Sequence, residues 1–264
     1  MTSLGVLLML IMPLESAQAA DTAAVYELRI YTAHPGRLPD VLARFRNHTC
    51  ALFERHGIVN VGYWTELQPK GVEQAGTEQK DSDKLYYVLK HKSRAAAEAS
   101  WAAFRADPEW IKARAASEEN GPIVQTIEST FLAAADFSPE KLISSGKKAG
   151  KNRVFELRTY TTNEGKLDTL NTRFREHTVA LFAKHGMTNL AYWHPTDADK
   201  GASNTLIYIL AHKDRGAATK SWADFGADPE WVKVRDASEA NGKILIENGV
   251  KSVFLTATDF SAVK

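Results

Sequence analysis

The chain has 264 residues, of which 44% are hydrophobic, and its 33 basic and 32 acidic residues give a net charge of +1. Acids and bases are mixed along the sequence, which excludes the basic stripe of a nucleic-acid-binding protein, so we expect no nucleic-acid partner. The length fits one large domain or two ordinary ones. Cys50 is the only cysteine, so we expect it to act as a small hydrophobic side chain, with no disulfide and no metal centre.

The first residues differ from the rest of the chain. Leu4 to Leu14 is an apolar run that is too short to span a bilayer but fits the core of a signal peptide. Ala17 and Ala19 place small residues where a signal peptidase recognises them. We therefore expect residues 1–20 to be a signal peptide, cleaved after Ala19 or Ala20, and the mature protein to be periplasmic or secreted, without a transmembrane segment. A membrane-facing anchor is the alternative, because no Lys or Arg precedes the run.

The segment that follows alternates between strand and helix patterns. Apolar and polar residues alternate from Val25 to Tyr31, as in a strand. Spacings of three and four between apolar residues then predict an amphipathic helix that ends before Gly57. Asp107 and Pro108 begin a later helix, because Asp caps well and Pro suits the first turn. In chain order we predict a strand at 25–31, a helix at 37–56, strands at 58–67 and 84–91, helices at 93–104 and 107–120, and a strand at 123–132.

Most of this segment occurs a second time. The stretch at 25–64, VYELRIYTAHPGRLPDVLARFRNHTCALFERHGIVNVGYW, returns at 154–193 as VFELRTYTTNEGKLDTLNTRFREHTVALFAKHGMTNLAYW, and the order of elements continues in the same way. Such a period indicates a duplicated domain. We therefore predict repeats at 24–137 and 153–261, joined by a polar linker at 138–152.

The order of elements in each repeat is that of the ferredoxin-like fold, in which both helices cover one face of an antiparallel sheet. The other face has to be buried by something else. We expect the bare faces of the two sheets to meet. The result is an α+β protein whose two tandem ferredoxin-like (βαββαβ) repeats form a dimeric-α/β-barrel-like arrangement. Alternatively, each repeat pairs with another chain, which makes the protein a homo-oligomer.

The alternation along the strands suggests which side chains face the inside of this barrel. We assign apolar positions such as Ile207 and Ile209 to the side that faces the helices, and the alternate positions to the inside. The assignment is weakest in the strand at 58–67, because a β-bulge there would reverse it. The candidate ligand-binding inner face then consists of Glu27, Arg29, Tyr31, Asn60, Trp64, Tyr87 and His91 in the first repeat and Glu156, Arg158, Tyr160, Asn189, Trp193, Tyr208 and His212 in the second.

These residues allow two interpretations. In the first, Glu27 and Arg29 form a buried ion pair that specifies how the sheets dock, and the aromatic residues fill space. In the second, they line a polar, aromatic-walled cavity for a small ligand. His91 and His212 are candidate general bases or axial haem ligands, although a hydrogen-bonded histidine at a strand end is the plainer interpretation. No phosphate loop or nucleophile elbow occurs in the sequence.

The recurring residues also resemble a known family. The cues are the strand openings at 26–31 and 155–160, the helix ends His56-Gly57 and His185-Gly186, the Trp64 and Trp193 strands, and the segments Trp101…Asp107-Pro108-Glu109-Trp110 and Trp222…Asp228-Pro229-Glu230-Trp231. Over nearly all of 25–260, twice, the chain resembles the NIPSNAP family.

The resemblance implies the dimeric α/β-barrel class, which contains cofactor-free monooxygenases, haem-handling enzymes and small-molecule isomerases. It implies no particular reaction, because the NIPSNAP family has no settled chemistry. We therefore expect an exported barrel protein that binds a small ligand or a protein partner and needs no cofactor. The alternative is a cofactor-independent monooxygenase-like or haem-binding enzyme of the same class, with a histidine as the base or haem ligand and Arg29 or Arg158 holding an anion.

Overall fold

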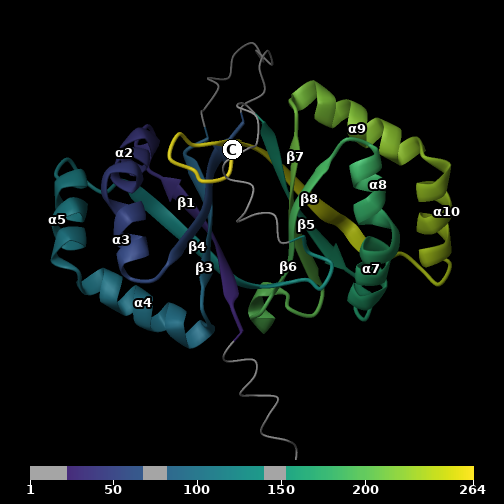
Figure 1. Ribbon diagram of the computed structural model, residues 1–264, viewed down its shortest axis with the longest axis horizontal. Helices are drawn as coiled ribbons and strands as arrows, with labels where there is room; N and C mark the ends of the chain where they lie inside the picture. The colour runs from purple at the N-terminus through teal and green to yellow at the C-terminus, as the bar shows by residue number, and fades with distance from the viewer. Residues whose placement is uncertain (1–22, 68–81, 140–152) are drawn as a thin grey trace, which may run out of the picture.

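The computed structural model describes residues 23–67, 82–139 and 153–264 (Figure 1). The predicted signal peptide at 1–20 lies outside these residues, as does most of the predicted linker. Within the described ranges, no helix combines the length and the hydrophobicity that a membrane span requires.

The two repeats have matching elements in the same order. The first contains β1 (Val25–Ala33), α2 (Leu38–Arg44), a π-helical turn (Phe45–Thr49), α3 (Cys50–Arg55), β2 (Val59–Glu66), β3 (Lys84–His91), α4 (Arg94–Ala106), α5 (Pro108–Ser117) and β4 (Val124–Ala134). The second contains β5 (Val154–Thr162), α7 (Leu167–Arg173), a π-helical turn (Phe174–Thr178), α8 (Val179–Lys184), β6 (Thr188–Pro195), a short 3-10 helix (Ala198–Lys200), β7 (Thr205–His212), α9 (Arg215–Ala227), α10 (Pro229–Ser238) and β8 (Leu245–Ala257).

The described strands close into one antiparallel barrel in the order β1-β3-β2-β8-β5-β7-β6-β4. Each repeat supplies one sheet. Short junctions join the two sheets, where Trp64 pairs with Ala257 between β2 and β8, and Leu132 pairs with Pro195 between β4 and β6. The helices of the two repeats lie outside, on opposite sides of the paired sheets (Figure 1). This arrangement confirms the predicted fold class.

Local signals explain where the helices begin and end. Gly57 follows α3 with a φ of 76°, a left-handed conformation that glycine adopts without strain. Asp107 caps α5, because its Oδ1 accepts a hydrogen bond from the backbone N–H of Glu109 at 2.8 Å. The same carboxylate contacts His56 Nε2 at 2.7 Å, which ties the end of α3 to the start of α5.

The predicted assignment of the two sheet faces is wrong. The barrel interior is a core of apolar side chains from both repeats, among them Leu28, Phe155 and Ile209. Apolar residues suit either face, because both faces of each sheet are buried. Among the described residues, the partners of the charged groups lie on the helix side, where Trp101 of α4 reaches Glu27. The residues predicted for the interior that lie under the helices instead are Glu27, Arg29, Tyr31, Asn60, Tyr87, His91, Glu156, Arg158, Tyr160, Asn189, Tyr208 and His212.

Two of the predicted residues, Trp64 and Trp193, do lie in the interior, and a bulge in each strand explains why. The pairing of β2 with β3 shifts between Asn60 and Gly62, so the strand's alternation reverses after that point. Asn60 therefore faces the helices, where its Nδ2 donates a hydrogen bond to the Cys50 carbonyl at 2.9 Å. Trp64 points into the barrel and is 1% exposed. Trp193 lies inside for the same reason, because β6 carries the corresponding shift.

Truncating a side chain in this interior should destabilise the whole barrel. We expect Phe155→Ala to lower the free energy of unfolding by about 3–5 kcal/mol, because Phe155 is 0% exposed and the removed ring leaves a cavity. Urea unfolding at pH 7 measures this loss. The control is Val250→Ala, which changes a side chain that is 42% exposed and should cost no more than about 0.5 kcal/mol. Equal losses in the two variants would contradict a packed interior.

Candidate functional site

A buried carboxylate on β1 organises the space between the sheet and the helices of the first repeat. Glu27 is 1% exposed. Its Oε1 accepts hydrogen bonds from Arg29 Nη1 at 2.5 Å and Ser129 Oγ at 2.6 Å, and its Oε2 contacts Trp101 Nε1 at 2.8 Å and His91 Nε2 at 2.9 Å. These partners come from β1, β4, α4 and β3, so one carboxylate ties three strands to a helix.

The second repeat contains the same cluster. Glu156 accepts hydrogen bonds from Arg158 Nη1 at 2.5 Å, Ser252 Oγ at 2.6 Å and Trp222 Nε1 at 2.7 Å, and it contacts His212 Nε2 at 3.0 Å. The ion pair predicted within each repeat is therefore present. It lies beneath the helices and does not join the two sheets.

These partners keep both carboxylates ionised. Burial opposes the charge, but the hydrogen bond from His91, the charge of Arg29 and the hydrogen bonds from Ser129 and Trp101 together lower the pKa of Glu27 from 4.5 to about 2. The corresponding partners lower the pKa of Glu156 to about 2 as well. An ionised, fully hydrogen-bonded carboxylate is a poor general base, so we assign Glu27 a positioning role.

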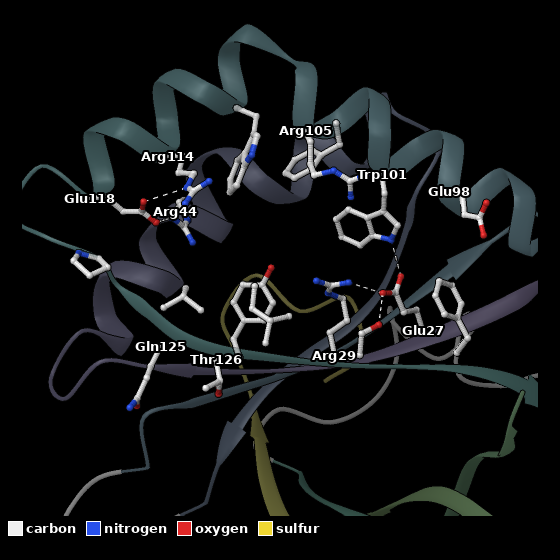
Figure 2. Close-up of a pocket in the computed structure, with 18 of the residues that line it drawn as sticks. Glu27, Arg29, Arg44, Glu98, Trp101, Arg105, Arg114, Glu118, Gln125 and Thr126 are labelled. Carbon is white, nitrogen blue, oxygen red and sulfur yellow. Dashed lines mark hydrogen bonds and ion pairs between the residues drawn. The ribbon is translucent and has the colours of Figure 1, made fainter. Parts of the chain in front are cut away.

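Next to Glu27, a cavity of about 730 Å³ opens between the sheet and helices α4 and α5 (Figure 2). This volume is in the range of small-molecule sites. Glu27 and Arg29 lie at its base, and Trp101 and Trp110 contribute aromatic walls from α4 and α5. Charged side chains are frequent among the described lining residues, which include five arginines, namely Arg29, Arg44, Arg94, Arg105 and Arg114, and three glutamates, namely Glu27, Glu98 and Glu118.

Arg29 is held in one orientation at the base of this cavity. Besides the bond to Glu27, its Nε donates a hydrogen bond to Tyr87 Oη at 2.9 Å. Its guanidinium carbon lies 4.5 Å from the ring centroid of Trp101, in the geometry of a cation–π contact. The side chain remains 15% exposed, which leaves part of the guanidinium open to the cavity. Neighbouring groups thus preorganise a buried cation.

Of the predicted site residues, the cavity brings together Glu27, Arg29 and Tyr31. Tyr87 and His91 lie behind these residues, both fully or almost fully buried. That the predicted residues bind a ligand stays a prediction. Other residues that line the cavity were not predicted from the sequence, among them Trp101, Trp110, Ser129 and Arg105. Arg105 lies one helical turn after Trp101 on α4, and its only signal in the sequence is the difference between copies, because Gly226 occupies the matching position.

The cavity of the first repeat does not fit haem. Its described lining residues include no His, Cys or Met, and the ring of Tyr31 packs edge-on against Phe45 and Tyr87. His91 is 2% exposed and its Nε2 is engaged by Glu27. Within the described ranges, moreover, no three His, Cys, Asp or Glu side chains are grouped so that they could hold a metal ion. We therefore derive no chemical step through haem.

Cys50 is not an activated nucleophile in this structure. Burial raises the pKa of its thiol from 9.0 to about 11. The thiol therefore stays protonated at neutral pH, and the thiolate is the reactive form of cysteine. This agrees with the expected role of Cys50 as a small hydrophobic side chain.

The space under the helices is smaller in the second repeat. A cavity of about 160 Å³ lies there, and its described lining includes Tyr160, Arg173 and Trp231 but not Arg158. Gly226 replaces Arg105, and Thr219 replaces Glu98. The Glu156 cluster is therefore kept in the second repeat without the large cavity that lies next to Glu27.

The two carboxylates should make stability depend on pH in the acidic range. A carboxyl group whose pKa is lowered on folding stabilises the fold above its unfolded pKa, and this stability is lost as the pH falls through the folded pKa. The window is about pH 4.5 to 2, and each group contributes roughly 3 kcal/mol at pH 7. We expect Glu27→Gln to be less stable at pH 7 and to lose less stability than the wild type between pH 5 and pH 3.

Urea unfolding at pH 7, 5, 4 and 3 measures this difference. Glu156→Gln should behave in the same way, because its cluster is the same. Glu128→Gln is the control, since Glu128 is exposed on β4, and its profile should follow the wild type. If the profiles of Glu27→Gln and the wild type run parallel, the carboxylate is not ionised as described.

Solved structures show the same fold at low sequence identity. A candidate monooxygenase from Lactobacillus acidophilus NCFM is 9% identical, with a TM-score of 0.54, over 89% of this chain and 94% of that chain. The candidate chlorite dismutase TA0507 is 10% identical, with a TM-score of 0.50, over 90% of this chain and 96% of that chain. No curated protein matches the chain. These likenesses establish the fold alone.

The family is established by the sequence. A family model described as NIPSNAP matches residues 26–139 and again residues 155–262. A NIPSNAP-like domain protein from Burkholderia xenovorans is 17% identical, with a TM-score of 0.36, over 45% of this chain and 90% of that chain. The two matches of the family model cover both repeats, and the chain belongs to the NIPSNAP family.

Proposed function

We propose that the protein binds a small organic molecule in the cavity of the first repeat, between the sheet and helices α4 and α5. One observation carries the proposal, namely that Arg29 is fixed at the base of a cavity of about 730 Å³ with part of its guanidinium open to it. Burying a guanidinium is costly unless it is paired. Glu27 and Tyr87 use only some of its N–H groups, so the remaining donors are available to a ligand.

The aromatic walls support a ligand with an apolar body. Trp101 and Phe104 on α4 and Trp110 on α5 line the cavity. The ring centroids of Phe104 and Trp110 lie 4.5 Å apart, so α4 and α5 present a continuous aromatic surface. A cavity with apolar walls and a few fixed polar groups is the usual form of a small-molecule site.

This geometry favours binding over catalysis. A cofactor-independent monooxygenase needs a base that reaches its substrate. Glu27 is held as an anion by its hydrogen-bond donors, and His91 is buried behind it with its Nε2 on the same carboxylate. We therefore keep the monooxygenase-like enzyme as the second candidate function, supported by the shared fold alone, and place binding of a protein partner after it.

We also propose that the protein is exported and that cleavage follows Ala19 or Ala20. The apolar run at 4–14 and the small residues after it support this, as does the presence of a single cysteine. The intact mass of the protein isolated from the extracytoplasmic fraction tests export. A mature chain that begins at Ala20 or Asp21 is the expected result, whereas a chain that retains residues 1–19 would contradict it.

A large side chain that fills the cavity should weaken the binding of the ligand. Ile127 lines the cavity from β4 and is 50% exposed, so we expect Ile127→Trp to fold normally and to weaken ligand binding at least tenfold by occupying the site. The measurement is saturation-transfer NMR with benzoate, 1-naphthoate, phenyl phosphate and the neutral amides of the two carboxylates.

Val250→Trp is the matched control, because Val250 pairs with Tyr160 on β5 as Ile127 pairs with Tyr31 on β1. Binding that is lost in Ile127→Trp and kept in Val250→Trp supports a site in the first repeat. Equal binding by both variants would place the ligand elsewhere, and an absence of binding by the wild type across the panel would overturn the proposed function.

A further inference from the structure

We infer that the ligand carries a carboxylate or phosphate group, that Arg29 and Arg105 clamp this group from opposite walls of the cavity, and that each chain has one such site. This inference rests on the proposed function and adds the chemical class and the stoichiometry of the ligand. Two features support it, namely the hydrogen-bond and ion-pair partners of each arginine around the cavity and the difference between the two repeats.

Arg29 supplies the fixed half of the clamp. Its Nη1 bonds to Glu27 and its Nε bonds to Tyr87, while its Nη2 makes no hydrogen bond with the described residues. A guanidinium group with a free edge binds carboxylate and phosphate oxygens well, because its planar donors match their geometry. The carboxylate of Glu27 is already shared among its own donors, so it neutralises Arg29 only in part.

Arg105 supplies the other half. In Figure 2 it extends from α4 toward the guanidinium of Arg29, with Trp101 beside both groups. Among the described residues, no acid or other acceptor contacts the Arg105 side chain, although Arg105 lines the cavity. Two cations that face each other repel, and an anion placed between them converts this repulsion into two attractions. The cavity that both groups line is therefore suited to an anion.

The other arginines of the cavity each have an acidic partner. Arg44 Nη1 and Arg114 Nε pair with Glu118 at 2.9 and 3.1 Å. Arg94 pairs with Asp197 at 2.9 Å. Among the described lining residues, Arg105 is thus the arginine without an acidic partner, and Arg29 keeps a free Nη2. These groups orient a ligand with its anionic group toward them and its apolar body toward the aromatic walls.

The second repeat keeps one half of the clamp and lacks the other. Arg158 stacks on Trp222 with its guanidinium carbon 4.1 Å from the ring centroid, as Arg29 does on Trp101. Gly226 occupies the position of Arg105, so α9 has no arginine at the position from which Arg105 extends on α4. A Cβ atom added at Gly226 would meet nothing within 4 Å, so a side chain can begin there without a clash at its Cβ. The asymmetry predicts one anion site in each chain.

Isothermal titration calorimetry with 1-naphthoate and its neutral amide, 1-naphthamide, tests the clamp. We expect one naphthoate per wild-type chain, with an affinity that falls as the salt concentration rises. Arg105→Ala should weaken naphthoate binding about tenfold, because it removes a charge-assisted hydrogen bond, and Arg105→Lys should restore part of the loss. Lys112→Ala is the charge control, since Lys112 is exposed on α5 outside the cavity lining, and it should change nothing.

Gly226→Arg puts an arginine at the matching position of the second repeat, and we expect the stoichiometry to stay at one, because the cavity there is only about 160 Å³ and Arg158 does not line it. A stoichiometry of two would overturn the dependence of the site on the large cavity. If naphthoate and naphthamide bind equally and Arg105→Ala affects neither, the clamp is wrong, while loss of both in Ile127→Trp still supports the proposed function. If neither compound binds the wild type and the wider panel also fails, both proposals fall.

Discussion

The buried carboxylate of Glu27, with its copy Glu156, is the constraint on which the rest of the structure depends. Burying a carboxylate is costly unless its oxygens are fully hydrogen-bonded. Here the hydrogen bonds come from Arg29 on β1, Ser129 on β4, His91 on β3 and the indole of Trp101 on α4. Satisfying this charge therefore fixes α4 against the sheet. It also fixes Arg29, so the same contacts that hold the layers together shape the floor of the cavity.

The architecture was predictable from the sequence because duplication and element order are properties of the chain itself. Two copies of a βαββαβ pattern leave two bare sheet faces, and burying each against the other is the simplest solution. The orientation of those faces was not predictable. In a sheet buried on both sides, alternation separates Ile209 from Tyr208 without showing which one meets the helices. The bulge after Asn60 then reversed β2. Gly62 marks its place in the first repeat, but Ala191 at the matching position of β6 carries no such signal, so the two copies together did not locate it.

The site was predictable in part for a similar reason. Glu27 and Arg29 were recognisable because charged residues in a buried strand require partners. Arg105 was not, because an arginine on the exposed surface of a helix looks like any solubilising residue. In the sequence, only the glycine at the matching position of the second repeat, Gly226, distinguishes Arg105 from such residues. The structure shows why this difference matters, because Trp101 and Arg29 lie near Arg105 at the same cavity. The duplication has thus kept the buried carboxylate cluster in both copies, whereas a cavity of about 730 Å³ lies next to the cluster of the first copy alone among the described residues.

The contact between Arg94 and Asp197 has a consequence for cooperativity. Arg94 lines the cavity of the first repeat and stacks on Phe131 with its guanidinium carbon 3.7 Å from the ring centroid, yet its ion-pair partner belongs to the second repeat. Docking of the two repeats therefore adds a contact to one residue of the cavity wall. If the proposed ligand contacts Arg94, its binding and the closing of the barrel would be thermodynamically linked, because each would stabilise the same position of this side chain.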